Sequence, residues 1–259
     1  MCSSLLIIVA IAQNHDNPEG LTGDYNNVQQ KQVAALEKLL TKGLNAFDNE
    51  DWETAYKTLH EYRTTADSLN MNIENKKMGV AAYCEGCSAY SLYLYKDAYA
   101  AFQVSNSLGY KNDKLKPLKD ECVLQIINRS DNYAETNDFV SKLLKEEPNN
   151  DAYNLGKAIS LDRSGDFDDA LKFYKKAIEL NPTDPTRYQL FGMSLSNKAE
   201  SDYENGSISI AKERYTQALH NFQKAMELLK NNDPSLSSTL AGIIQLFINS
   251  IEDRLSSIQ

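Results

Sequence analysis

The sequence predicts an all-α fold, a right-handed α-solenoid of about five helix–turn–helix pairs with a C-terminal capping helix. The first observation is a pattern that occurs five times: an aromatic residue, a small residue three positions later and an apolar residue four positions after that. The five copies are Trp52–Ala55–Leu59, Tyr95–Ala98–Phe102, Tyr133–Thr136–Val140, Phe167–Ala170–Tyr174 and Tyr215–Ala218–Phe222. Spacings of three and four place each copy on one helical face, where the small residue lets a neighbouring helix approach.

The second observation is the spacing of the apolar residues along the whole chain. Spacings of three and four run from Val33 to Leu255, and no long segment alternates with a period of two. Helices are therefore favoured over strands. A recurring helix pair predicts a stack in which neighbours share a core and present an extended surface to a partner.

The N-terminal residues have a different composition. Leu5–Ala12 is an apolar run too short to span a bilayer as a helix, and Ala10-x-Ala12 before Gln13 resembles a signal-peptidase site. We expect residues 1–12 to be the remnant of a signal peptide and the chain to be exported to the periplasm or cell envelope. The alternative is a packed N-terminal segment of a cytoplasmic protein. Residues 13–29 are polar and predict a flexible linker, so the solenoid is expected over residues 30–259.

The clearest helix pair lies between Asp151 and Asp184. Gly165-Asp166 supplies the turn, because glycine adopts the backbone angles of a tight reversal. Asn181-Pro182 ends the second helix, because proline cannot continue a helix interior. Earlier in the chain, extra residues around 70–77 and 110–116 are expected to lengthen the connections between repeats.

This pair carries the residues of a known repeat. Pro148 lies 34 residues before Pro182, which is the period of the tetratricopeptide repeat (TPR). The small, aromatic and proline positions of that repeat are matched by Gly165, Phe167, Ala170, Tyr174, Ala177 and Pro182. The chain resembles that family over residues 36–230, most closely over 117–184. The resemblance implies a non-enzymatic scaffold that binds another protein or a peptide.

The last pair departs from the repeat. Extra residues over 197–214 predict that both helices of the pair at 185–230 extend beyond the usual turn, with Asn205-Gly206 as the reversal. Residues 235–259 form one amphipathic helix with a wide apolar stripe, which predicts a helix that caps the stack. The alternative is a structural subunit that oligomerises through this helix.

Composition and motifs argue against several classes of function. A net charge of −9 without a basic stripe disfavours nucleic acid, since binding to nucleic acid neutralises phosphates with Lys and Arg. Cys84-x-x-Cys87 allows a redox or metal role, but no second such pair or histidine cluster completes a metal site. We therefore expect no cofactor, no metal and no enzymatic activity. An exported solenoid with a redox or metal role at Cys84 and Cys87 is kept as an alternative, and disulfides among Cys84, Cys87 and Cys122 stay open.

The family resemblance also implies where a partner binds, because the first helix of each TPR pair lines the concave face. The expected groove residues are Leu40, Leu44, Phe47, Tyr83, Cys87, Tyr90, Glu121, Gln125, Asn128, Arg129, Leu155, Ile159, Asp162, Arg163, Gln189, Met193 and Ser196. Asn128 and Arg129 come nearest to the family's carboxylate-binding set, but the lysines of that set are missing. An apolar or aromatic stretch of a partner, anchored by Tyr83 and Tyr90, is the expected ligand.

Overall fold

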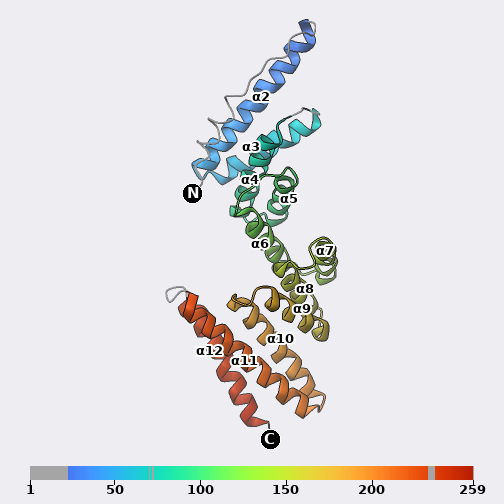
Figure 1. The fold of residues 1–259 in the computed structure, drawn as a ribbon, viewed down its shortest axis with the longest axis vertical. Coiled ribbons are helices and arrows are strands. Elements are labelled where there is room, and N and C mark those ends of the chain that lie inside the picture. Colours follow the sequence, from blue (N-terminus) through green and yellow to red (C-terminus); the bar gives the residue numbers. More distant parts are fainter. Residues whose placement is uncertain (1–22, 70, 72, 233–236, 259) are drawn as a thin grey trace. The chain divides into compact units, whose positions relative to one another are not determined.

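The structure, a computed structural model, describes residues 23–69, 71, 73–232 and 237–258. In this part of the chain there are eleven helices and no strands, which confirms the all-α class. The helices follow one another as five pairs and a terminal helix, as the repeat pattern predicts (Figure 1). The chain divides into two units, Met1–Cys122 (unit 1) and Val123–Gln259 (unit 2).

Unit 1 is built from four helices and the first part of a fifth. They are α2 (Gly23–Asp48), α3 (Trp52–Ser68), α4 (Asn75–Ser91), α5 (Tyr95–Ser107) and α6 (Leu115–Asn128), which continues into unit 2. Two glycines bring paired helices close together. A Cβ atom at Gly43 would lie 2.6 Å from the Leu59 side chain, and one at Gly86 would lie 2.6 Å from the Phe102 ring. Leu59 and Phe102 are fully buried, so the core of each pair forms where a small residue faces a large one.

A buried carboxylate joins the first pair of unit 1 to the second. Glu85 on α4 is only 1% exposed. It accepts a hydrogen bond from Arg63 Nε at 2.8 Å and contacts His60 Nδ1 at 2.8 Å, and both partners lie on α3. A buried charge needs such partners, because removing it from water is otherwise strongly unfavourable.

Unit 2 contains the end of α6 and six further helices. They are α7 (Tyr133–Glu146), α8 (Asp151–Arg163), α9 (Phe167–Leu180), α10 (Pro185–Glu204), α11 (Ile208–Asn232) and α12 (Ser237–Ser257). The same small-to-large packing recurs. A Cβ atom at Gly156 would lie 2.5 Å from Ile127, and one at Gly192 would lie 3.1 Å from the Phe222 ring.

The last pair is longer than the pair before it, as predicted. α10 and α11 have 20 and 25 residues, whereas α8 and α9 have 13 and 14. The extension is held by buried Asp202, which forms an ion pair with Arg214 and lies 3.6 Å from Lys198 Nζ.

Four of the turns between paired helices close in the same way. The second residue after the first helix adopts a left-handed backbone conformation, and two backbone N–H groups donate to carbonyls of the last helical turn. In the α8–α9 turn, Gly165 N donates to Asp162 O at 3.0 Å and Asp166 N donates to Leu161 O at 3.0 Å. Gly206 takes this position in the α10–α11 turn, so the reversals predicted at Gly165 and Gly206 are confirmed. The other two turns place Glu50 and Tyr93 there, with φ of 59° and 62°.

The C-terminal helix packs as a cap on α11. The Phe247 ring stacks on Phe222 at 5.2 Å, with Ile244, Ile248 and Ile251 buried on the same side of α12. Arg254 forms an ion pair with Glu200 of α10. The apolar stripe predicted for this helix therefore does cover the end of the stack.

The start of α2 differs from the sequence prediction. The helix begins at Gly23, so residues 23–29 are helical rather than part of a linker. No glycine or proline lies between Asp24 and Lys42, and a helix formed at 30–48 extends over such a segment at little free-energy cost. The predicted signal-peptide remnant, residues 1–12, and the linker residues 13–22 lie outside the described residues. None of the described helices has both the length and the apolar character needed to cross a membrane.

Candidate partner-binding surface

Three of the groove residues predicted in unit 1 lie in the core. Leu40 and Leu44 are buried in α2, and Tyr83 on α4 is only 8% exposed. The Tyr83 ring packs against Phe102 at 6.0 Å and Tyr110 at 5.4 Å. The long connection after α5 places Tyr110 against α4, so Tyr83 is covered by a residue outside the repeat pattern. The prediction that Tyr83 anchors a partner is therefore corrected.

Two apolar groove residues of unit 2 are buried as well. Leu155 and Ile159 on α8 are 3% and 6% exposed. Between them, Gly156 lets α8 approach Leu124 and Ile127 of α6 so closely that little space remains at this face. Leu155 and Ile159 therefore lie in the core and do not line an open groove, which corrects their assignment.

Polar groove residues of unit 2 are brought together at the ends of first helices. Arg163 donates from Nη1 to the Ile127 carbonyl at 2.8 Å and from Nη2 to Asn128 Oδ1 at 3.2 Å. Ser194 donates to Asp162 Oδ1 at 2.6 Å, and burial raises the pKa of Asp162 although Ser194 and Arg163 act in the opposite direction. These contacts tie the end of α6 and α10 to α8, so they give Arg163 and Asp162 a structural role.

The other predicted residues remain at least partly accessible. Asn128 and Arg129 are exposed. The half-buried ones are Phe47, Cys87, Tyr90, Glu121, Gln125, Gln189, Met193 and Ser196. Of these, Cys87 and Tyr90 lie one helical turn apart on α4.

The cysteine thiols lie in an environment that keeps them protonated. Burial raises the pKa of Cys87 to about 11 and that of Cys122 to about 12, and it raises the pKa of Cys84 well above its ordinary value. The thiolate is the form that attacks disulfides and binds metals, so this environment acts against the redox or metal alternative at Cys84 and Cys87. The described residues contain no group of three or more His, Cys, Asp or Glu side chains that could hold a metal ion.

The turn between α4 and α5 exposes two large side chains that the groove prediction did not include, one aromatic and one aliphatic. Tyr93 is 66% exposed and Leu94 is 40% exposed. Buried Tyr95 makes edge-on contacts with two neighbours, with Tyr90 at 5.4 Å and with Tyr93 at 6.3 Å. We call residues 90–95 the tyrosine turn. The ring of Tyr93 thus stands on a buried aromatic support at the surface of unit 1.

A sequence signal for Tyr93 existed. The turn residue stands two positions before the aromatic anchor in three repeats: Glu50 before Trp52, Tyr93 before Tyr95 and Gly165 before Phe167. A bulky aromatic residue is a true outlier in the left-handed conformation. Aligning the repeats on their anchors therefore singles out Tyr93 as the unusual residue at this position.

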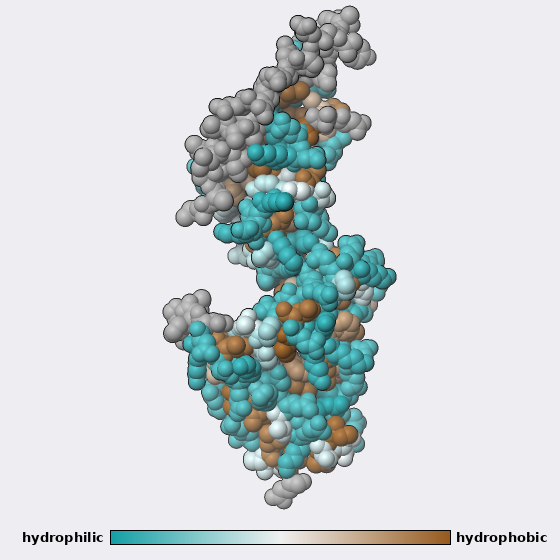
Figure 2. Space-filling model, in the orientation of Figure 1, coloured by the Kyte–Doolittle hydropathy of each residue, from teal (hydrophilic) through white to brown (hydrophobic). Residues whose placement is uncertain are grey.

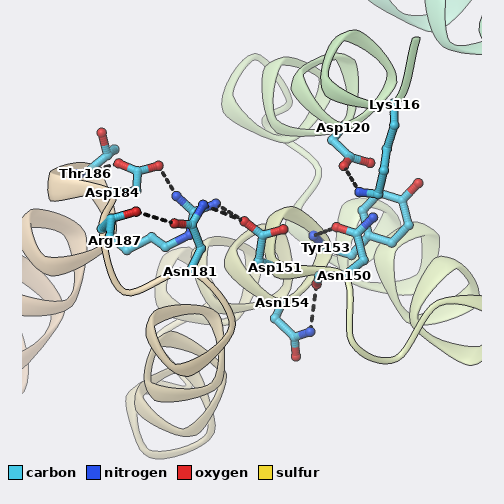
Figure 3. A network of polar contacts seen from close by, with 11 residues as sticks. Lys116, Asp120, Asn150, Asp151, Tyr153, Asn154, Asn181, Asp184, Thr186 and Arg187 are labelled. Carbon is cyan, nitrogen blue, oxygen red and sulfur yellow. Dashed lines mark hydrogen bonds and ion pairs between the residues drawn. The ribbon is translucent and has the colours of Figure 1, made fainter. Parts of the chain in front are cut away.

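A network of polar contacts holds the junction between α8, α9 and α10 (Figure 3). Buried Arg187 forms ion pairs with Asp151 and Asp184, and Asn181 Nδ2 donates to Asp151 Oδ2 at 3.1 Å. Partial burial acts to raise the pKa of Asp151, but the Asn181 hydrogen bond and the charge of Arg187 outweigh it and lower that pKa. Sequence reasoning missed Arg187, because its partners lie up to 36 residues away.

Comparison with known proteins places repeats in two stretches of the chain. A model of the tetratricopeptide repeat matches residues 154–184, and the SHNi-TPR model matches residues 206–235. The first match covers most of α8 and α9, and the second begins at the α10–α11 turn and covers α11. No curated protein matches the chain.

Several solved structures are similar to the chain. MamA residues 41 to the end, from Desulfovibrio magneticus RS-1, is 16% identical, with 82% of this chain and 99% of that chain covered and a TM-score of 0.48. YrrB, a TPR protein with an unusual peptide-binding site, is 14% identical, with coverages of 78% and 93% and a TM-score of 0.47. The paired helices and the two matched repeat models lead to one conclusion: the chain contains tetratricopeptide repeats, at residues 154–184 and 206–235.

Proposed function

We propose that the chain is a non-enzymatic scaffold that binds another protein, and that the tyrosine turn is a contact surface on unit 1. The observation that carries this proposal is the backbone conformation of Tyr93, which has a φ of 62° beneath a ring that is 66% exposed. A left-handed conformation costs an ordinary L-residue about 1–2 kcal/mol. Glycine avoids this cost in the α8–α9 and α10–α11 turns.

The closure of the turn does not need the tyrosine side chain. Tyr93 N donates to Tyr90 O and Leu94 N donates to Ala89 O, both at 2.9 Å, and these are backbone contacts that glycine also makes. A tyrosine at this position therefore works against stability while it exposes an aromatic ring. Strained residues of this kind are concentrated at functional sites.

The chemistry of the surface fits protein recognition. Tyrosine offers a large rigid contact area and a hydroxyl group with few rotatable bonds, which is why it is enriched among residues that dominate binding energy. Leu94 adds exposed apolar area beside it. Tyr90 and Cys87 continue the accessible surface along α4, so the predicted contact is centred on Tyr93 and Tyr90 in place of Tyr83.

The test compares two substitutions at equivalent turn positions. Tyr93→Gly relieves the backbone strain and removes the ring, whereas Glu50→Gly relieves the same strain in the α2–α3 turn and leaves the tyrosine turn intact. We expect each variant to gain up to about 1 kcal/mol in free energy of unfolding, measured with urea. The immobilised wild type and both variants then capture proteins from an extract of the native host, and mass spectrometry quantifies what each retains.

The proposal requires a protein that the wild type and Glu50→Gly retain and that Tyr93→Gly loses at least tenfold. If Tyr93→Gly gains stability and still retains every protein that the wild type retains, the tyrosine turn is not a binding surface. Tyr90→Ala adds a second measurement, because we expect it to weaken capture of the same protein.

A further inference from the structure

One helical glycine stands apart from the others in the described part of the chain. Ideal Cβ atoms at Gly43, Gly79, Gly86, Gly156 and Gly192 would lie 2.5–3.1 Å from side chains of the same chain. A Cβ atom at Gly242, in the first half of α12, would meet nothing within 4 Å. Glycine is unfavourable in a helix interior, so its presence there calls for a reason. A close contact supplies that reason for the other five glycines but not for Gly242.

Gly242 belongs to an exposed apolar stripe on the outer face of α12. Leu246 follows it one turn later and is 70% exposed, and Ile243 beside them is 42% exposed. The opposite face of the helix is already used, since Ile244, Ile248 and Ile251 are buried against the rest of unit 2. We call Gly242, Ile243 and Leu246 the outer stripe.

The outer stripe lies in an unusual stretch of sequence. Charged residues make up 24% of the chain, yet residues 234–251 contain none. The helix that ends a repeat stack needs a polar outer face to stay in solution. Hydrophobic residues interrupt the mainly hydrophilic surface where α12 lies (Figure 2). α12 thus covers unit 2 on one side and has the composition of a contact surface on the other.

We propose that the outer stripe is the contact between two copies of this chain, with α12 packed against α12 across a two-fold axis. A two-fold contact places each residue near its own counterpart, so charged residues at its centre would repel each other. A chain with a net charge of −9 therefore associates with itself most favourably across a face without charges. Contacts with a different protein typically use complementary charges instead, and the outer stripe has none.

Gly242 then has a role, because the absence of a Cβ atom lets the two helices approach closely. Leu246 of each copy fills the space beside it. Gln245 and Asn249 flank the stripe and share a hydrogen bond of 2.9 Å, so the rim of the contact is polar but uncharged. This contact uses unit 2 and is independent of the tyrosine turn on unit 1.

The first test measures the mass of the full chain in solution. We expect sedimentation velocity and light scattering to show a dimer of the wild type at about 100 μM, well above a micromolar dissociation constant. Leu246→Glu places a charge at the centre of the contact and should weaken association at least tenfold. Ile210→Glu is the matched control: it adds the same charge at an exposed isoleucine of α11, which is 48% exposed, and should leave the dimer intact.

The second test uses one substitution that should stabilise the monomer and weaken the dimer. Gly242→Ala removes the unfavourable glycine from a site with open space, so we expect a higher Tm at low concentration, where the chain is monomeric. The same substitution should weaken the dimer, because the added methyl group separates the two helices. A monomeric wild type, or a dimer that Leu246→Glu and Gly242→Ala leave unchanged, would overturn the proposal. A monomeric wild type that floats with phosphatidylcholine vesicles would assign the stripe to a lipid surface instead.

Discussion

At the scale of single residues, burial decides the chemistry of the cysteine pair on α4. Cys84 is 4% exposed and Cys87 is half-buried, beside the covered ring of Tyr83. Burial raises the pKa of Cys87 to about 11, even though a hydrogen bond with Tyr83 and the charge of Lys114 act to lower it. At neutral pH these thiols are small apolar side chains in a helix.

We predict that Cys87 reacts slowly with iodoacetamide in the folded protein. At pH 8 its rate should be about two orders of magnitude below that of the urea-unfolded chain, because only the thiolate reacts and an unperturbed cysteine has a pKa of about 8.5. The rate should rise about tenfold per pH unit towards pH 11. Timed alkylation followed by peptide mass spectrometry measures this, and equal rates in folded and unfolded chains would contradict the burial.

The raised pKa of Cys87 also determines how the stability of the folded chain changes with pH. The folded state holds the Cys87 proton more tightly than the unfolded state does. Its contribution to stability is therefore complete below the unfolded pKa, and it is lost as the pH rises from about 8.5 towards 11.

At the scale of elements, the junction between α8, α9 and α10 depends on Arg187. We predict that Arg187→Ala lowers the free energy of unfolding by about 3–5 kcal/mol, because Asp151 and Asp184 lose the charge that compensates them. Lys172→Ala is the matched control. It breaks the exposed pair with Asp169 and should cause no measurable change. Urea unfolding followed by circular dichroism measures both, and equal effects would show that the network adds nothing to stability.

Some of the helices and turns were predictable from the sequence, because they depend on residues that are close together along the chain. The anchors at Trp52, Tyr95 and Phe167 begin α3, α5 and α9 because aromatic, small and apolar residues at helical spacing define one buried face. The turn at Gly165 follows from the backbone freedom of glycine. The fold could therefore be derived from short segments.

The candidate surface was less predictable, because it depends on contacts between distant segments. Tyr83 is covered by Tyr110, and the end of α6 accepts hydrogen bonds from Arg163, 36 residues further along the chain. Repeat spacing gives the face of a helix on which a residue lies, but it does not say whether an irregular connection covers that face. Tyr93 was missed for another reason: the prediction used first-helix positions and left out the turns.

At the scale of the whole molecule, the division into two units predicts that a destabilising substitution in one unit leaves the unfolding of the other unchanged. The single tryptophan, Trp52, lies in unit 1, where it packs edge-on against Phe47 at 5.6 Å. Ala170→Leu overpacks a fully buried site in unit 2 and should cost about 1–3 kcal/mol there. We expect Ala170→Leu to lower the urea midpoint of the circular dichroism signal that comes from unit 2. The midpoint of Trp52 fluorescence, which reports on unit 1, should stay unchanged.

The control introduces the same side chain at an exposed position of the same helix. Lys175 is exposed, and surface substitutions usually change stability by less than about 0.5 kcal/mol, so Lys175→Leu should leave both midpoints nearly unchanged. If Ala170→Leu shifts the Trp52 fluorescence and the circular dichroism together, the two units unfold as one cooperative body.

The shared closure of the turns has a consequence for how such a chain diversifies. The turn-closing hydrogen bonds at Glu50, Tyr93, Gly165 and Gly206 come from the backbone alone, so the closure of each turn does not depend on the side chain at that position. A single codon change there alters what the edge of the repeat displays, at a cost of about 1–2 kcal/mol and without repacking either helix. Natural selection and protein engineers thus have the same four positions at which to give an old scaffold a new specificity.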